Sequence, residues 1–380
     1  MRFPITRGTL NLTQACNLAC SYCFTGGKSN KKMTFELAKK IIDFLFFNAE
    51  KGNRKAIEIT FWGGEPLLEW ELIKKIVRYV ESVKNGIKAD FGGTTNGTLL
   101  TEEKLKFFDD HGGIAFMVSL DGTPDTHNRY RTFHDGGGSQ AVIMRNLEKA
   151  LKYCKGYRVR MSPYAEGIHR FYDDVVYLVS HGIGQLMFSP VYESGWTEEK
   201  WMIWEEQCHA VVDLIAEKKK KGFDFDIAHF RSYTGPDHSH WPCGAGRDYV
   251  GFDLDGALYP CHRFSKFSDI RPWHLKPMVI GHVDYGVTDH HLRSQFINFL
   301  PSSGCQWKDC FESTPCHGGC YAVNYDMTGN IHTAPSVLCR YVEMQKRVSS
   351  YYIQKMDFKQ KLPAGKPCAC HFEFYCGPVS

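Results

Sequence analysis

The chain has 380 residues, of which 43% are hydrophobic and 23% are charged. This balance excludes a disordered or low-complexity chain, and the length suits two domains or one large domain with an appendage. The formal net charge of +4 does not favour a nucleic-acid partner, and the apolar runs fall far below the roughly 20 residues that span a bilayer, so we expect no membrane partner. Because the N-terminus shows no tripartite secretion signal, we expect a cytoplasmic protein, in which fifteen cysteines point to metal-binding thiolates.

Short β-type runs alternate with amphipathic helices from residue 9 to about residue 220. The predicted strands are Leu10–Leu12, Ile57–Phe61, Asp90–Thr95, Ala115–Leu120, Arg158–Met161 and Gln185–Ser189. The predicted helices are Met33–Ala49, Leu72–Val80, Glu102–Phe108, Asn146–Tyr153, Tyr172–Ser180 and Glu198–Lys220. Thr34 and Gly52 are the expected N-cap and stop of the first helix. Six β/α units predict an α/β protein with parallel strands, either a closed or partly closed barrel or a doubly wound sheet.

The run Lys218–Lys221 is read as the solvated C-terminus of a helix. Beyond Gly222 the composition changes. Residues 223–350 are rich in Gly, Pro, His and Cys, which is the composition expected where metal sites replace part of a hydrophobic core. We therefore predict domains at residues 1–222 and 223–350, followed by a helix and cysteine-containing tail at residues 351–380.

Three cysteines, Cys16, Cys20 and Cys23, follow the first predicted strand with the spacing C-x3-C-x2-C. A structural zinc ion takes four ligands, so three close thiolates favour a 4Fe–4S cluster with one iron open to an exogenous ligand. A zinc site with a distant fourth ligand is the alternative.

The run from Cys16 to Phe24 resembles the signature motif of the radical SAM superfamily, C-x3-C-x2-C followed by an aromatic residue. The resemblance implies a partial (β/α)6 TIM-like barrel whose catalytic cysteines hold a cluster that chelates S-adenosylmethionine (SAM). One electron then cleaves SAM to a 5′-deoxyadenosyl radical, as expected of a radical SAM oxidoreductase.

Further runs resemble family positions that bind SAM, and each follows a predicted strand. Gly63, Gly64 and Glu65 match the GGEP motif, which holds the methionyl amino group. The remaining positions, beside the ribose and carboxyl groups, are Asn96, Ser119, Asp121 and Arg131. A turn or a helix cap is the alternative for each of these runs.

A second set of cysteines follows residue 240. Val250, Phe252 and Leu254 alternate with other residues before Asp255-Gly256, which predicts a hairpin with a type I′ turn. This hairpin would fold Cys243 and Cys261 toward each other. Five more cysteines follow within one hundred residues of Cys243: Cys305, Cys310, Cys316, Cys320 and Cys339.

This pattern resembles the small cysteine-rich SPASM domain of radical SAM enzymes, which houses two auxiliary 4Fe–4S clusters. The resemblance assigns one cluster to Cys243, Cys261 and Cys320 and the other to Cys305, Cys310, Cys316 and Cys339. One gap departs from the family, with four residues between Cys305 and Cys310 where two are usual. The first cluster lacks a fourth ligand, which substrate or one of three tail cysteines would supply: Cys368, Cys370 and Cys376. Tetrathiolate zinc is the alternative, and Cys154 and Cys208 are expected to be buried small hydrophobes.

The resemblance implies hydrogen abstraction from a peptide or protein and an oxidative modification, such as a crosslink, a thioether or an oxidised residue, as in maturation of ribosomally made peptides. Sulfatase-maturing members place an aspartate base after the second auxiliary cysteine, where this chain has His262. His262 is a candidate proton acceptor, because an imidazole titrates near neutral pH, and a structural role beside a cluster is the alternative.

The expected partners are a substrate peptide and a low-potential electron donor such as flavodoxin or ferredoxin. Because the first strand begins close to Met1, a separate leader-peptide recognition protein is a further expected partner. The alternatives are a dehydrogenase or rearrangement enzyme acting on a small metabolite, and a non-enzymatic iron–sulfur or zinc scaffold.

Overall fold

The computed structural model describes residues 3–113, 115–153, 158–231, 243–265, 275–298 and 318–356. The chain forms two compact units. Unit 1 comprises Met1–Val118, Arg131–Tyr157 and Gly244–Leu300, and unit 2 comprises Ser119–Tyr130, Arg158–Cys243 and Pro301–Ser380. Because each unit gathers separate stretches of chain, the domain bounds after residues 222 and 350 stay a prediction.

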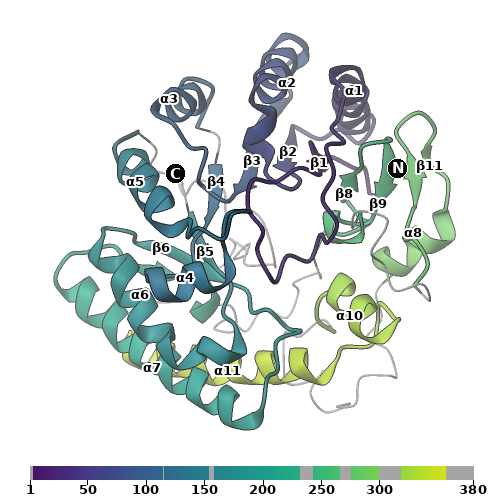
Figure 1. The fold of residues 1–380 in the computed structure, drawn as a ribbon. Helices are drawn as coiled ribbons and strands as arrows, with labels where there is room; N and C mark the ends of the chain where they lie inside the picture. The colour runs from purple at the N-terminus through teal and green to yellow at the C-terminus, as the bar shows by residue number, and fades with distance from the viewer. Residues whose placement is uncertain are drawn as a thin grey trace. The chain divides into compact units, whose positions relative to one another are not determined.

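Unit 1 is built on a sheet whose central strand is β1 (Arg7–Asn11) (Figure 1). The strands β1, β2 (Ala56–Trp62), β3 (Lys88–Thr95) and β4 (Ala115–Ser119) are parallel neighbours in that order. On its other side β1 pairs in parallel with β8 (Tyr249–Phe252). The sheet continues with three short antiparallel strands: β9 (Ala257–Tyr259), β10 (Gly281–His282) and β11 (Gly286–Val287).

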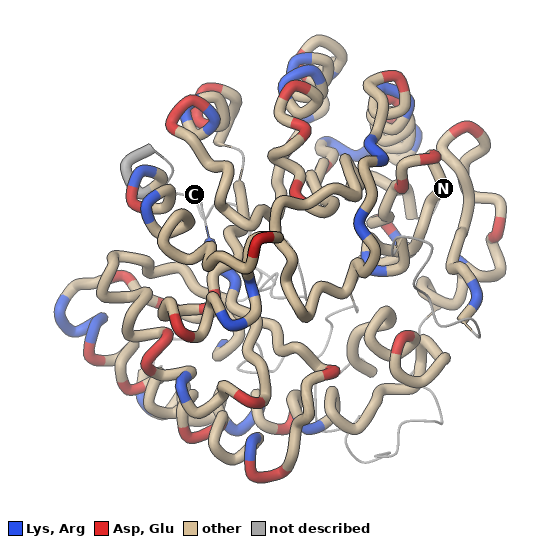
Figure 2. Tube along the Cα trace, viewed as in Figure 1, with Lys and Arg blue, Asp and Glu red and all other residues tan. Residues whose placement is uncertain are grey.

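Four predicted helices are present in unit 1: α1 (Phe35–Lys51), α2 (Trp70–Val83), α3 (Glu102–Asp110) and α5 (Gln140–Tyr153). The sequence did not predict three shorter ones: η1 (Pro66–Glu69), η4 (His262–Phe264) and α8 (His290–Ile297). The Thr34 hydroxyl accepts from Leu37 N at 3.2 Å and Gly52 ends α1, which confirms both predicted caps. Figure 2 shows Lys/Arg and Asp/Glu interspersed along α1, α2 and α3.

The hairpin β8–β9 is present, but its predicted type I′ turn is wrong. A type I′ turn needs positive φ at both central residues, whereas only Gly256, with φ of 90°, has it in this loop. The loop is longer because β8 already ends at Phe252, and the Asp253 carboxylate accepts from Leu254 N at 2.8 Å.

Unit 2 contains three parallel strands in sequence order, β5 (Arg158–Met161), β6 (Gln185–Phe188) and β7 (Asp226–Ile227). Its helices are α4 (Pro124–Tyr130), η2 (Ala165–Arg170), α6 (Phe171–Ser180), α7 (Glu198–Lys220), η3 (Ala228–Arg231), α10 (Tyr321–Thr328) and α11 (Ser336–Lys355).

Two long helices, α7 and α11, pack together in unit 2. The buried Trp204 ring of α7 stacks on Tyr341 of α11, with ring centroids 5.7 Å apart. Arg347 adds a bidentate ion pair with Glu205, with its shortest contact at 2.7 Å. None of the described helices has both the length and the apolar character that a membrane crossing requires.

Candidate functional site

The three cysteines Cys16, Cys20 and Cys23 lie in a loop of unit 1 between β1 and α1. The base of this loop is closed by an antiparallel bridge between Thr13 and Lys32. We call residues 13–32 the cysteine loop. Its closed base brings the cysteines back to the carboxyl end of β1, the edge at which α/β folds place their chemistry.

The segment 131–134 supports the cysteine loop from a second side. Ala19 N donates to Thr132 O at 2.8 Å, and His134 Nε2 lies 2.9 Å from Cys16 O. The guanidinium of Arg131 lies over the Tyr22 ring, 5.0 Å from its centroid. Arg131 is therefore held against the cysteine loop, although more than one hundred residues separate them in sequence.

The cysteine thiols are close enough to influence one another. Burial raises the pKa of Cys16, which the Lys28 ammonium opposes, and burial raises the pKa of Cys20, which the Arg131 guanidinium opposes. Cys23 adds to both upward shifts, because each thiolate repels its neighbours. A cation binding to all three thiolates would remove this repulsion.

The chemistry of these donors fits a cluster. All three cysteines are free thiols and partly exposed. Among the described residues, no group of three or more His, Cys, Asp or Glu is arranged to hold a single metal ion. Cysteine thiolates are the usual ligands of iron–sulfur clusters, so three cysteines in one loop suit such a group.

The Gly63–Glu65 loop packs against the backbone of the cysteine loop. Gly64 N donates to Thr13 O at 2.8 Å, and Glu65 N donates to Ala15 O at 2.9 Å. A Cβ on Gly64 would lie 2.1 Å from Ala15 O, and one on Gly63, whose φ is 151°, would lie 2.4 Å from Thr13 O. Only glycine allows this close approach, so the two glycines fix the GGEP run beside the cysteines.

The Glu65 carboxylate is fully buried and joins the loops that follow β2 and β3. It accepts hydrogen bonds from Leu67 N at 3.0 Å, Thr95 Oγ1 at 2.8 Å and Asn96 N at 2.7 Å. Burial raises the pKa of Glu65 to about 7, although these hydrogen bonds and the Lys104 ammonium favour the charged form. The structure therefore places Glu65 and Asn96 together, and the carboxylate is hydrogen-bonded to the loop after β2 and to the loop after β3.

His262 is buried in η4 directly after Cys261, and it contacts other side chains of unit 1. Its Nδ1 lies 2.6 Å from the Tyr249 hydroxyl, which in turn lies 2.9 Å from Thr9 Oγ1. The Trp62 ring packs edge-on against the imidazole, with centroids 5.1 Å apart. Tyr249 and Thr9 were not found from the sequence, because their spacing from His262 follows no motif.

Ser119 ends β4, and Asp121 belongs to the loop that follows in unit 2. Both side chains are buried. The Asp121 carboxylate accepts from Ser162 N at 2.8 Å, and its own backbone N donates to His127 Nδ1 at 3.2 Å. Asp121 thus connects the loop after β4 to the residue that follows β5.

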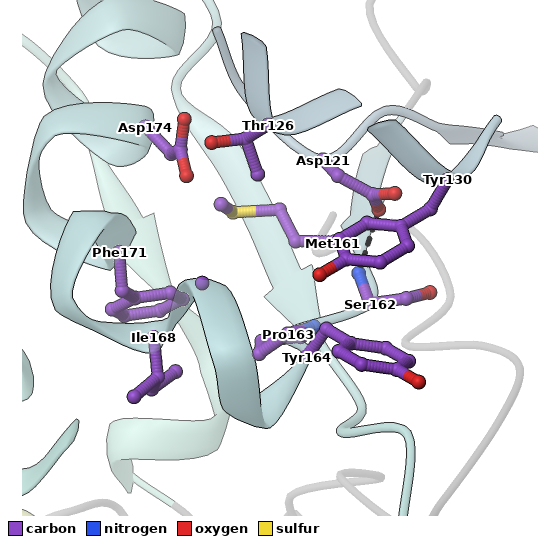
Figure 3. A pocket seen from close by; sticks show the side chains of 11 residues that line it. Asp121, Thr126, Tyr130, Met161, Ser162, Pro163, Tyr164, Ile168, Phe171 and Asp174 are labelled. Carbon is purple, nitrogen blue, oxygen red and sulfur yellow. Dashed lines mark hydrogen bonds between the residues drawn. The ribbon is translucent and has the colours of Figure 1, made fainter. Parts of the chain in front are cut away.

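A small pocket, partly open to solvent, lies beside this loop within unit 2 (Figure 3). Tyr130 and Tyr164 stack along one wall with centroids 4.4 Å apart, and Asp174 and Thr126 face each other along another. This pocket was not predicted, since its lining comes from α4, η2, α6 and the end of β5.

Asp174 holds the turn beside this pocket. Its Oδ1 accepts from Thr123 N at 2.9 Å and from Thr123 Oγ1 at 2.7 Å. A Cβ on Gly122, whose φ is 130°, would lie 2.3 Å from the Asp174 side chain. Burial raises the pKa of Asp174 to about 6, because it disfavours the ionised carboxylate. The hydrogen bonds from Thr123 favour the ionised form.

Four of the seven predicted auxiliary-cluster cysteines are described, and none of these four forms a disulfide within the described part of the chain. Cys243 precedes Gly244, Cys261 is buried after β9, Cys320 is the N-cap of α10, and Cys339 lies in the first turn of α11. Cys305, Cys310 and Cys316 lie outside the described residues, as do Cys154, Cys368, Cys370 and Cys376. Cys208 is buried in α7, as expected.

Comparison with known proteins agrees with the sequence motifs. Residues 10–163 match the family model described as Radical SAM superfamily. The chain is 23% identical over 380 residues to a serine-type anaerobic sulfatase-maturating enzyme of Bacteroides thetaiotaomicron. The aligned region covers 91% of this chain and 89% of that protein. It is 31% identical over 182 residues to an uncharacterized protein of Methanocaldococcus jannaschii, and it spans 60% of that protein with 47% of its own length.

A solved structure described as native anSMEcpe with bound AdoMet and Cp18Cys peptide has a similar fold. It matches with a TM-score of 0.71 at 19% identity, covering 93% of this chain and 98% of that chain. This likeness confirms the predicted α/β class, in which the parallel sheet of a partial radical SAM barrel is followed by a C-terminal region.

Proposed function

Since this chain belongs to the radical SAM superfamily through residues 10–163, we propose that it cleaves SAM reductively and abstracts hydrogen from a peptide or protein. Cys16, Cys20 and Cys23 would hold a 4Fe–4S cluster, and one iron would remain for SAM. When bound, this cluster supplies the single electron that cleaves the sulfonium. The observation that carries the proposal is the packing of the Gly63–Glu65 loop on the loop of three thiols.

The chain's own residues would position SAM. We assign the amino group of SAM to the Gly63–Glu65 loop. The buried Glu65 carboxylate holds this loop next to Asn96 by accepting a hydrogen bond from Asn96 N. Arg131, fixed over Tyr22, would pair with the SAM carboxylate. By their resemblance to family positions, Ser119 and Asp121 are the proposed residues for the ribose and carboxyl groups.

The peptide class rests on likeness along most of the chain. The similar sulfatase-maturating enzyme covers 91% of this sequence, and the similar solved structure is described with a bound peptide. We propose an oxidative modification in which the second set of cysteines holds auxiliary clusters that accept an electron. His262, bonded to Tyr249, is the proposed acceptor of the substrate proton.

Anaerobic turnover tests the proposal. Reconstituted protein with SAM and dithionite should release 5′-deoxyadenosine and methionine, and Cys20→Ala should release neither while keeping the secondary structure seen by circular dichroism. Absence of these products from cluster-loaded protein would reject the proposal.

Substrate class is tested by label transfer. A deuterated peptide pool should place deuterium in 5′-deoxyadenosine, whereas transfer only from a deuterated metabolite extract would reject the peptide class. His262→Asn should release 5′-deoxyadenosine with little modified peptide, because hydrogen abstraction then loses its following proton transfer. If His262→Asn left the ratio of modified peptide to 5′-deoxyadenosine unchanged, His262 would not be the proton acceptor.

A further inference from the structure

Three polar side chains form a ring next to Cys16. Asn17 lies within the cysteine loop, and Asn96 and Thr98 follow β3. Asn96 Nδ2 donates to Asn17 Oδ1 at 2.8 Å, and Asn17 Nδ2 donates to Thr98 Oγ1 at 2.7 Å. Thr98 Oγ1 then donates to Asn96 Oδ1 at 2.7 Å, which closes the ring. We call these three residues the amide ring.

The direction of every hydrogen bond in the amide ring is fixed by one backbone group. Thr98 N can only donate, and it lies 3.0 Å from Asn96 Oδ1. The oxygen of the Asn96 amide must therefore face Thr98, and its NH₂ group must face Asn17. Asn17 accepts with its own oxygen, so its NH₂ group is the one that reaches the Thr98 hydroxyl.

This orientation turns the Asn96 NH₂ group toward sulfur. Asn96 Nδ2 lies 3.8 Å from Cys16 Sγ, within range of an N–H···S hydrogen bond. The Leu18 backbone N approaches the same sulfur at 3.4 Å. Cys16 thus receives two N–H donors, one from its own loop and one from the loop after β3.

The Asn96 amide is held rigidly. The residue is 8% exposed, and its backbone N donates to the buried Glu65 carboxylate. Asn146 Nδ2 on α5 donates to Gly97 O at 2.9 Å and to Thr98 O at 3.0 Å, which fixes the backbone on the other side of Asn96. A donor held this firmly contributes a constant dipole toward the sulfur.

We propose that the Asn96 amide, oriented by Asn17 and Thr98, raises the reduction potential of the cluster bound to Cys16, Cys20 and Cys23. This inference rests on the proposed function, because it requires a cluster on these cysteines. Reduction adds negative charge to a cluster and its thiolates, and N–H donors to the sulfurs stabilise that charge. The amide ring therefore positions the Asn96 N–H donor toward Cys16 Sγ, and this hydrogen bond would raise the reduction potential of the cluster.

The test is an anaerobic redox titration of the reconstituted full chain without SAM, followed by electron paramagnetic resonance. A chain with Cys16, Cys20 and Cys23 all changed to Ala supplies the signals of any other clusters for subtraction. Asn96→Ala should shift the midpoint to a more negative potential. Asn17→Ala should shift it in the same direction but less, since Asn96 keeps its two bonds to Thr98.

Thr98→Val is the matched control. It removes the hydroxyl but keeps the backbone N that orients Asn96, so its midpoint should stay near that of the wild type. Equal midpoints for the wild type, Asn96→Ala and Asn17→Ala would overturn this inference, whereas the proposed function would still be supported by the wild-type cluster signal. Failure of the proposed function looks different, because the wild type would then show no signal that the triple cysteine variant lacks.

Discussion

At the scale of single residues, the Glu65 carboxylate joins two loops at a cost in free energy. Its pKa of about 7 in the folded state lies above the ordinary glutamate value, because burial disfavours the charge. Such a group contributes stability below its ordinary pKa, and this contribution is lost as the pH rises through about 7.

Glu65→Gln should therefore show a pH-dependent difference from the wild type. The variant should be less stable, since glutamine offers one acceptor oxygen to three donors. The stability advantage of the wild type should shrink as the pH rises from about 5 to about 8. Anaerobic urea unfolding at several pH values measures this, and a constant difference would mean that Glu65 titrates at an ordinary pKa.

At the scale of elements, the contact between the Gly63–Glu65 loop and the cysteine loop leaves no room for a side chain. Gly64→Ala would place a Cβ 2.1 Å from Ala15 O, so the two loops must separate. We expect the variant to bind much less iron after reconstitution. Gly167→Ala is the control, because a Cβ there meets nothing within 4 Å. Equal iron content in the two variants would show that the contact is not needed for the cysteines.

Asp174 supports the turn at Gly122 and Thr123 from the first turn of α6. Asp174→Ala leaves two Thr123 donors without their acceptor, so it should lower the free energy of unfolding by about 1–3 kcal/mol. Asp174→Asn keeps an acceptor and removes a buried charge, so its thermal midpoint at neutral pH should equal or exceed that of the wild type. The exposed neighbour Asp173→Ala is the control. A loss no larger for Asp174→Ala than for Asp173→Ala would contradict this role.

At the scale of the whole molecule, local signals predicted what depends on local sequence. The alternation of strands and helices, the caps of α1 and the cysteine and GGEP runs all follow from neighbouring residues. Contacts between distant residues could not be predicted in this way. Asn17 meets Thr98, His262 meets Tyr249, and Asp174 meets Thr123 only after the chain has folded.

The same distinction explains the error in the β8–β9 turn. Asp255-Gly256 carries the local signal of a two-residue turn, but Gly256 N donates to Asp253 O at 3.0 Å, so the turn already begins at Asp253 and the loop is longer. The auxiliary-cluster assignment depends wholly on distant cysteines, and it stays a prediction. Three 4Fe–4S clusters would give about twelve irons per chain, and Cys261→Ala should bring this down toward eight. Iron analysis that returns about four in the wild type would reject the auxiliary clusters.

We propose that Cys16, Cys20 and Cys23 hold a cluster with one iron free for SAM. Electron paramagnetic resonance of the dithionite-reduced protein, recorded with and without SAM, tests it most directly. We predict a signal that changes when SAM is added, and we predict that this change is absent when the three cysteines are alanine. A wild-type spectrum that SAM leaves unaltered would contradict a cluster with an iron free for SAM.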